Sequence, residues 1–180
     1  MKKKLKIATI LIIFISFGWF AYTNLYTAQN LRRYSVYYAH NMERKKGTHP
    51  EMAMALENIK VIRTPASRGI RYDYDGLAKV YNDINNRNSP SICATYVYGV
   101  EYLYSKSKDR IYIFNSDFSL KAIYDSNTAK MEYEKSDIDE EKLYKEVYKN
   151  FGFLVEANVN RKPLINMQKE FNKKYYKRFN

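Results

Sequence analysis

ICATYVYGVEYLY, residues 92–104, alternates two kinds of side chain along its length. The more aromatic set takes every second position and consists of Ala94, Tyr96, Tyr98, Val100, Tyr102 and Tyr104. The other set is more polar and includes Thr95, Gly99 and Glu101. A period of two with aromatic and β-branched residues is typical of a β-strand with two different faces. We therefore predict a strand here, with the tyrosines on one face and a wetter opposite face.

Three shorter segments of similar composition follow at 110–114, 118–124 and 129–135. The turn-forming sequences SKSKD, NSD and DSNT separate the strand-like segments from one another. Short turns between successive strands join antiparallel neighbours. The sequence therefore predicts an antiparallel meander of about four strands.

Helical periodicity precedes the predicted sheet. Apolar residues recur every three or four positions from Ala28 to Met42, and nothing before Gly47 ends a helix that starts near the N-terminus. The motif THPE at 48–51 has the features of a capped helix start. Residues 77–84 show a third amphipathic pattern, which predicts a short helix.

Helical periodicity also follows the predicted sheet. Ser136 or Asp137 is the expected cap of a helix that ends at Gly152, and a last helix is expected from Pro163 onward. Residues 153–160, FLVEANVN, fit either an edge strand or a loop. Helices on both sides of a meander give an α+β fold, with helices packed on one face of the sheet.

The first 26 residues are predicted to form a unit separate from the α+β domain. Four lysines among the first six residues precede an apolar segment, Leu5–Tyr22, that has no charge after Lys6. As a helix this segment would span roughly 27 Å, close to the ~30 Å of a bilayer core. Aromatic rings suit the membrane–water interface, and three lie at its far end: Trp19, Tyr22 and Tyr26.

The apolar segment is predicted to be an uncleaved anchor. The alternatives are a cleaved signal peptide and a buried core helix of a soluble protein. Cleavage favours small residues at −3 and −1, whereas Trp19 and Tyr26 lie at −3 of the two alanine-ended sites. Because positive charge favours the cytoplasmic side, we expect a single-pass protein of the bacterial inner membrane, with residues 27–180 forming one exported, periplasmic domain.

The composition is strongly basic and contains one cysteine. The net charge is +12, and the four lysines at the N-terminus leave about +8 for the remainder. A basic balance is compatible with anionic partners, but an AT-rich genome would also enrich lysine and the 19 tyrosines. Because Cys93 is the only cysteine, no intramolecular disulfide can form, and we expect it to be a buried, structural thiol.

No catalytic or metal-binding motif is present in the sequence. His40 and His49 are the only histidines, and His40 with Glu43 would supply only two ligands on a helix face. There is no Gly-x-Ser-x-Gly, no paired cysteines and no glycine-rich phosphate loop. The sequence therefore predicts a protein that is not an enzyme and has no cofactor or metal. An enzyme is the third hypothesis, and a deep pocket that holds a polar cluster would favour it.

Two features are candidates for a binding surface. The tyrosine face is expected to be a core face under the helices, although exposed rings could instead stack on bases or sugars. The C-terminal 20 residues carry seven basic side chains and one acidic side chain. This pattern is typical of a solvated helix face, and a basic surface that binds an anionic partner is the alternative. The candidate residues are Tyr96, Tyr98, Tyr102, Tyr104, Lys173, Lys174, Lys177 and Arg178.

The layout of one span, helices, a meander and a closing helix resembles the periplasmic scaffold subunits of bacterial secretion channels. Those subunits have a cystatin-like or nuclear-transport-factor-like α+β fold, but their Asn-Pro-x-Gly signature is absent here. We expect a function in protein binding, as an immunity-type toxin neutraliser or as a subunit of an envelope or secretion machine. The alternative is a membrane-tethered binder of an anionic polymer (DNA, lipopolysaccharide or phospholipid). Nucleic acid is scarce outside the cytoplasm and is not the expected partner.

Overall fold

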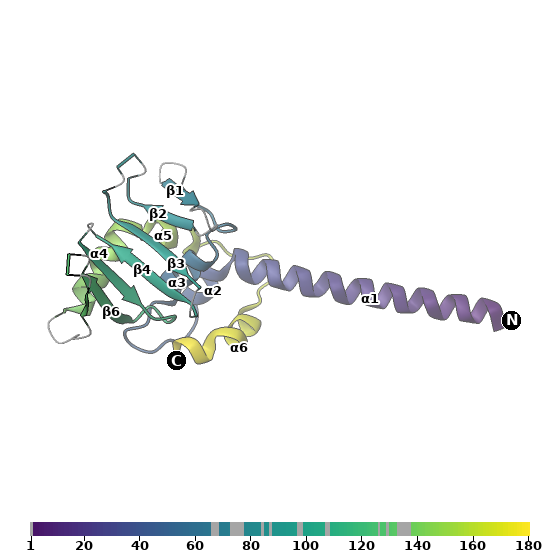
Figure 1. Cartoon of the computed structure of the whole chain (residues 1–180). Coiled ribbons are helices and arrows are strands. Elements are labelled where there is room, and N and C mark those ends of the chain that lie inside the picture. Colours follow the sequence, from purple (N-terminus) through teal and green to yellow (C-terminus); the bar gives the residue numbers. More distant parts are fainter. Residues whose placement is uncertain are drawn as a thin grey trace.

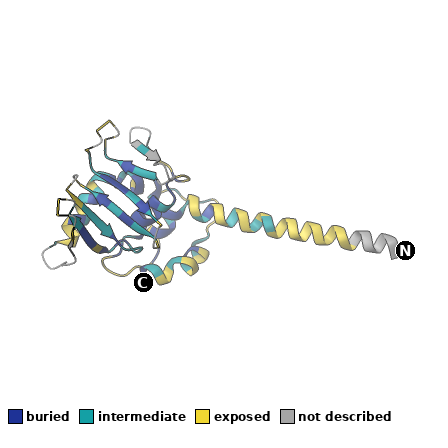
Figure 2. Cartoon of the chain, in the orientation of Figure 1, coloured by how far each residue is buried: buried dark blue, intermediate teal, exposed yellow. Residues whose placement is uncertain are grey.

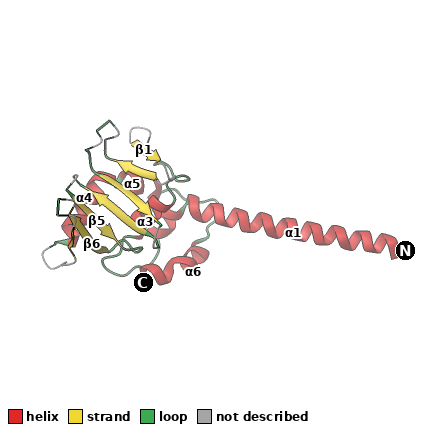
Figure 3. Cartoon of the chain, viewed as in Figure 1, coloured by secondary structure: helices red, strands yellow, loops and turns green. Residues whose placement is uncertain are grey.

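The computed structural model combines six helices with one antiparallel sheet in the part of the chain that it describes (Figures 1 and 3). The described residues are 2–65, 69–72, 78–83, 85–86, 88–96, 99–106, 109–125, 127–128, 130–132 and 138–180. The helices are α1 (Lys2–Arg33), α2 (Ser35–His40), α3 (Pro50–Glu57), α4 (Glu140–Phe151), α5 (Phe153–Val159) and α6 (Gln168–Phe179). The strands are β1 (Gly69–Tyr72), β2 (Ala78–Tyr81), β3 (Ser91–Thr95), β4 (Glu101–Ser105), β5 (Arg110–Phe114), β6 (Leu120–Asp125) and β7 (Lys130–Glu132).

Helix α1 projects away from the rest of the molecule (Figure 1). Its segment Thr9–Arg33 is the one helix among the described residues that is long and apolar enough to cross a membrane, with a mean hydropathy of 1.5. The proposed boundary at residue 26 lies inside this helix. The prediction of one helix reaching Lys46 is wrong, because the helix is interrupted at Tyr34 and α2 ends at His40.

The seven strands lie in sequence order, β1 to β7, and each pairs antiparallel with the next. The α+β class and the meander are therefore confirmed. The meander is longer than expected for two reasons. Residues 92–104 form a hairpin of two strands, β3 and β4, and the region before them supplies β1 and β2.

The hairpin explains why residues 92–104 resemble one strand in the sequence. Both halves are rich in strand-forming residues, and the reversal lies near Gly99, whose φ of 109° is readily adopted only by glycine. Ala94 is paired with Tyr102 and Ile92 with Tyr104, so both halves turn their even-numbered residues to the same face. The alternation therefore predicts correctly which residues share a face, although the chain reverses within the segment.

Two predicted elements are wrong. The helix predicted at 77–84 is replaced by β2, because Val80 pairs with Ile92 and gains sheet hydrogen bonds in the buried interior. Residues 153–160 form helix α5 rather than a strand or loop. The Asn158 side chain fixes α5 to the loop before β1, since its Nδ2 donates to the Arg63 carbonyl at 2.8 Å.

The helix starts also differ from the sequence prediction. Helix α3 begins at Pro50 without a side-chain cap, because Thr48 donates its hydroxyl to the Lys45 carbonyl instead. Asp139 caps α4 by accepting from the Lys142 amide, whereas the predicted caps, Ser136 and Asp137, lie outside the described residues. The last helix begins at Gln168, so Pro163 lies in a loop that precedes it.

The core lies between the sheet and the helices behind it (Figure 2). Helices α3, α4 and α5 lie against one face, and α6 packs beside α2. Almost every residue of α3 is buried, from Pro50 to Leu56. The largest fully buried side chains are aromatic and include Tyr38, Tyr102, Tyr104, Phe118, Phe151, Phe171 and Phe179.

Candidate functional site

Two of the predicted binding tyrosines belong to the core. Tyr102 and Tyr104 are 0% exposed, which confirms the core interpretation for both. The Tyr104 hydroxyl donates to Glu146 Oε1 at 2.7 Å. Burial, reinforced by this carboxylate, raises the pKa of Tyr104. Burial also raises the pKa of Tyr102, whose hydroxyl donates to Glu57. Both phenols therefore stay protonated and donate hydrogen bonds to carboxylates.

The remaining candidates that the structure describes are divided between exposed side chains and one that points inward. Tyr96 is 51% exposed and lies just beyond the end of β3, while Tyr98 lies outside the described residues. The three lysines predicted on the last helix are exposed: Lys173, Lys174 and Lys177. Arg178, their neighbour in sequence, points inward, and only 17% of its side chain is exposed.

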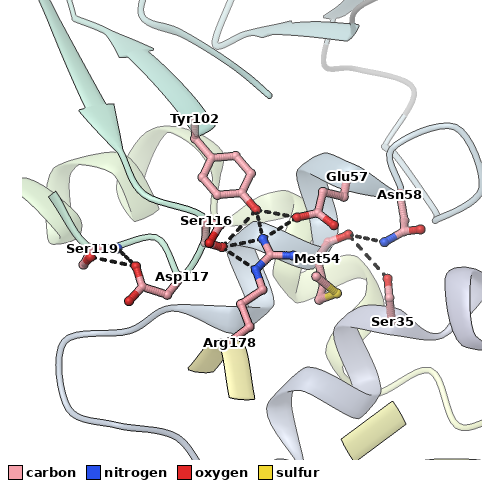
Figure 4. A network of polar contacts seen from close by, with 9 residues as sticks. All are labelled: Ser35, Met54, Glu57, Asn58, Tyr102, Ser116, Asp117, Ser119 and Arg178. Carbon is pink, nitrogen blue, oxygen red and sulfur yellow. Dashed lines mark hydrogen bonds and ion pairs between the residues drawn. The ribbon is translucent and has the colours of Figure 1, made fainter. Parts of the chain in front are cut away.

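Arg178 ties the C-terminal helix to the sheet and to α3 (Figure 4). Its guanidinium donates to the Ser116 carbonyl, with Nε at 2.6 Å, and it also contacts the Glu57 carboxylate and the Tyr102 hydroxyl. The Tyr102 hydroxyl in turn donates to Glu57 Oε1 at 2.6 Å. These mutual contacts describe a structural junction of three elements rather than a site open to a ligand.

The opposite face of the sheet carries an apolar row, of which Cys93, Leu103 and Ile113 are partly exposed and Ala122 is buried. Cross-strand pairs join Cys93 to Leu103, Leu103 to Ile113, and Ile113 to Ala122, across β3, β4, β5 and β6. We call these four residues the sheet row. The sequence predicted this parity to be the wetter face, and for the sheet row that prediction is wrong. Cys93 is partly exposed here, so the expectation of a buried thiol is also corrected.

The sheet row is flanked by an ion pair and by a second row of larger side chains. On one side Lys121 pairs with Glu101. On the other side Ile111 is paired with Tyr124, and both are partly exposed. This face is turned toward the viewer in Figure 1, and none of the described helices lies over it.

A stacked pair of rings separates two cavities on the helical side. The imidazole of His49 lies on the phenol ring of Tyr144, with centroids 3.2 Å apart and planes inclined by 10°. One cavity has a volume of about 350 Å³ and a largely apolar lining that includes Phe114, Phe118 and Leu120. The second, of about 480 Å³, is lined by more polar groups that include His40, Arg44 and Glu51.

The groups around the second cavity are paired with one another. Glu51 is buried and accepts from Arg44, and its other oxygen lies 3.3 Å from His40 Nδ1. Burial and, to a smaller extent, the nearby positive charge of Arg44 lower the pKa of His49 to about 4. Among the described residues no group of three His, Cys, Asp or Glu side chains is arranged to hold a metal ion. The cavity residues thus provide a neutral imidazole and an internal ion pair.

Comparisons of the chain with protein-family models, with curated proteins and with solved structures found no match. The candidate site is therefore interpreted from its own residues. The sheet row was missed in the sequence, although Cys93 and Leu103 already share the parity opposite to the tyrosines. Ile113 could be added to them only after the register of β4 and β5 was known.

We expect His49 to make the folded domain sensitive to mild acid. Its folded pKa of about 4 lies below the ordinary 6.5, so its contribution to stability is present above pH 6.5 and is lost as the pH falls toward 4. At about pH 5, linkage between the two pKa values gives a loss of about 2 kcal/mol in the free energy of unfolding. This value is an upper limit, because the ring is partly exposed and water screens its charge. Urea unfolding of the full chain in detergent, at about pH 7.5 and about pH 5, measures this difference.

His49→Phe should keep the ring stack on Tyr144 and remove this part of the pH dependence. His40→Gln, at the other histidine, is the control and should retain it. An unchanged pH dependence in His49→Phe would contradict the assignment to His49.

Proposed function

We propose that this chain is a single-pass membrane-anchored protein whose C-terminal domain acts by binding another protein through the open face of the sheet. The sheet row carries the proposal. Antiparallel sheets that face water on one side usually place polar side chains there. This face instead presents Leu103 and Ile113, both partly exposed, in the middle of the sheet, and adjacent apolar side chains in contact with water are a feature of interaction sites.

The surroundings of the sheet row fit a protein interface better than a lipid or polymer site. Its apolar centre is bordered by the Lys121–Glu101 ion pair, and the aromatic Tyr124 lies beside it. Protein interfaces combine an apolar, aromatic centre with a polar rim. The border contains both charge signs, which favours a partner with mixed surface charge over an anionic polymer.

Helix α1 supports anchoring in a membrane by its length and apolar composition. With the lysine-rich N-terminus in the cytoplasm, the anchor would hold the domain in the periplasm beside a bacterial inner membrane. A tethered binder in that place suits an immunity-type protein that neutralises an incoming toxin, or a subunit of an envelope or secretion machine. A neighbouring toxin gene would favour the first of these two kinds.

A second candidate function is binding of an anionic polymer by α6. Its exposed lysines, Lys173, Lys174 and Lys177, favour it. Burial of Tyr102 and Tyr104, however, removes two rings from any stacking platform and leaves Tyr96 as an exposed one. Such binding should weaken steeply as the salt concentration rises, whereas binding at the sheet row should change little.

The proposal predicts that a charge in the sheet row strongly weakens partner binding without unfolding the domain. Ile113→Lys places an ammonium group opposite Leu103. Because a central apolar contact can contribute about 2 kcal/mol to binding, partner affinity should fall about 30-fold. The cost in stability should stay near 1 kcal/mol, the scale of one cross-strand pair.

The measurement is quantitative co-purification from native membranes with the tagged full-length protein, read by mass spectrometry. Asn127→Lys, in the exposed turn between β6 and β7, is the matched control with the same added charge. Partners retained by Asn127→Lys and lost by Ile113→Lys would support the proposal. Equal recovery by both variants, with both folded at the temperature of the assay, would refute it.

A further inference from the structure

Basic side chains lie near the point where α1 meets the domain. They come from the end of α1, from residues 58–65 and from residues 160–167, and they are Arg32, Arg33, Lys60, Arg63, Arg161 and Lys162. The two loop segments and the stretch 23–42 contain no acidic residue. We call these six basic residues, together with the exposed apolar residues Val61, Leu164 and Ile165, the collar.

Hydrogen bonds hold the 160–167 loop against α1. Asn30, on α1, donates its Nδ2 to the Ile165 carbonyl at 3.3 Å. The Tyr38 hydroxyl donates to Asn30 Oδ1 at 2.6 Å and accepts from the Met167 amide at 3.1 Å. The loop is therefore fixed beside the helix, as Figure 1 also shows for the segment between α5 and α6.

The charges of the collar lie close to one another. The Arg161 guanidinium lies over the Tyr34 ring, 5.0 Å from its centroid. Burial lowers the pKa of Arg161, and the positive charges of Arg33 and Arg63 lower it further, which places these three side chains within electrostatic reach. Beside them, Gln29, Arg32, Arg33 and Val61 line a cavity of about 360 Å³.

Apolar side chains in the collar are exposed to an unusual degree. Leu164 is 100% exposed and Ile165 is 54% exposed, although both belong to the loop that α1 holds in place. Val61 is 37% exposed and borders the basic cavity. Apolar side chains next to Lys and Arg are the combination that binds the boundary between anionic headgroups and acyl chains.

The position of the collar along the axis of α1 matches the expected position of the lipid headgroup layer. A bilayer core of ~30 Å takes about 20 helical residues, so a span that starts at Leu5 ends near Leu25. Asn30 then lies about 7.5 Å farther along the axis, at ~1.5 Å per residue. The headgroup layer extends roughly 5–8 Å beyond the core on each side. The loop that Asn30 holds is therefore at the outer edge of that layer.

We propose that the collar docks on anionic phospholipid headgroups of the membrane that α1 crosses, with Leu164 and Ile165 entering the interface. This inference rests on the anchoring role of α1 in the proposed function. Docking would fix the orientation of the domain relative to the membrane, and with it the direction in which the sheet row faces. A single helix without such a contact would let the domain swing about α1.

Spin labels on the full-length protein in lipid nanodiscs test this proposal. The Cys93→Ala background carries one label at a time, at Leu164→Cys, at Asn127→Cys in the distant β6–β7 turn, or at Ile12→Cys in α1. Nanodiscs contain phosphatidylcholine alone or with phosphatidylglycerol. Collision with a water-soluble nickel chelate reports exposure, and collision with oxygen reports contact with acyl chains.

The label at 164 should be shielded from nickel in the anionic nanodiscs and more accessible in neutral ones, while the label at 127 stays accessible in both. Lys162→Glu should lower the ratio of docked to free loop at least about fivefold, the factor that corresponds to one basic residue near an anionic surface. Arg110→Glu, an exposed residue at the far end of β5, is the matched control and should leave that ratio unchanged.

Two outcomes would overturn the collar while leaving the anchor intact. In the first, the label at 164 is as accessible as that at 127 in both lipids. In the second, shielding at 164 is the same in neutral and anionic nanodiscs, which would exclude recognition of the headgroup charge. A label at Ile12 that nickel reaches and oxygen does not would refute the anchoring role and the collar together.

Discussion

Replacing Tyr102 by alanine should lower the free energy of unfolding by about 3–5 kcal/mol, the range for a large buried aromatic side chain. Tyr102 is 0% exposed, and its ring packs on Phe118 with centroids 4.9 Å apart. Its hydroxyl also donates to Glu57 and accepts from Arg178. Alanine would thus leave a cavity in the core and remove one partner from two charged groups. Such a loss is a large share of the ~5–15 kcal/mol of a typical domain.

Phenylalanine separates the two contributions of Tyr102. Tyr102→Phe keeps the ring in the core and removes only the hydroxyl, so the loss should be about 1.5–3 kcal/mol, as for a hydrogen bond to a charged group. Urea unfolding of the full chain in detergent gives both values. Tyr96→Ala is the control, because Tyr96 is 51% exposed and its removal should leave unfolding nearly unchanged. Equal effects of Tyr96→Ala and Tyr102→Ala would contradict the core assignment.

The buried face of the sheet was predictable because it follows from local pattern. Tyr102 and Tyr104 alternate with more polar neighbours, and this period of two places them on one side whatever the strand pairs with. Helix α4 was predictable for the same reason, since its apolar residues recur at helical spacing and include Leu143, Val147 and Phe151.

Elements whose conformation depends on distant partners were not predictable. Val80 is compatible with helix or strand, and pairing with Ile92 decides for the strand. A register shift near Ile113 and Phe114 changes the faces along β6. Ala122 therefore joins the sheet row and Ile123 turns to the opposite face, where simple alternation predicts the reverse.

The role of Arg178 was hidden for a related reason. In the sequence it is one of several basic residues in the last helix, alongside Lys173, Lys174 and Lys177. The helix end is fixed from outside, because the Phe179 carbonyl accepts from the Lys45 amide at 2.8 Å and the Phe179 ring is buried. This attachment turns Arg178 inward while the lysines stay exposed, so one basic segment contains both a structural residue and a solvated face.

Replacing Arg178 by methionine should lower the free energy of unfolding by about 3 kcal/mol. That value is at the low end of the ~3–5 kcal/mol expected when one partner of a buried ion pair is removed, because the pair retains some contact with water. The side chains of Arg178 and Glu57 are 17% and 14% exposed. Methionine fills similar space but leaves the Glu57 carboxylate with the Tyr102 hydroxyl as its remaining partner in this junction.

The double variant Glu57→Leu/Arg178→Met should be more stable than Arg178→Met alone, because it removes the uncompensated carboxylate together with the guanidinium. Lys145→Met provides the matched control in an exposed pair with Glu141, where both side chains are more than two-thirds exposed, and it should not change the melting temperature. Thermal melts of the parent, Glu57→Leu, Arg178→Met, the double variant and Lys145→Met test the coupling. If the effects of Glu57→Leu and Arg178→Met simply add in the double variant, the two side chains do not act as a pair, and the C-terminal helix must be held by Phe171 and Phe179 without them.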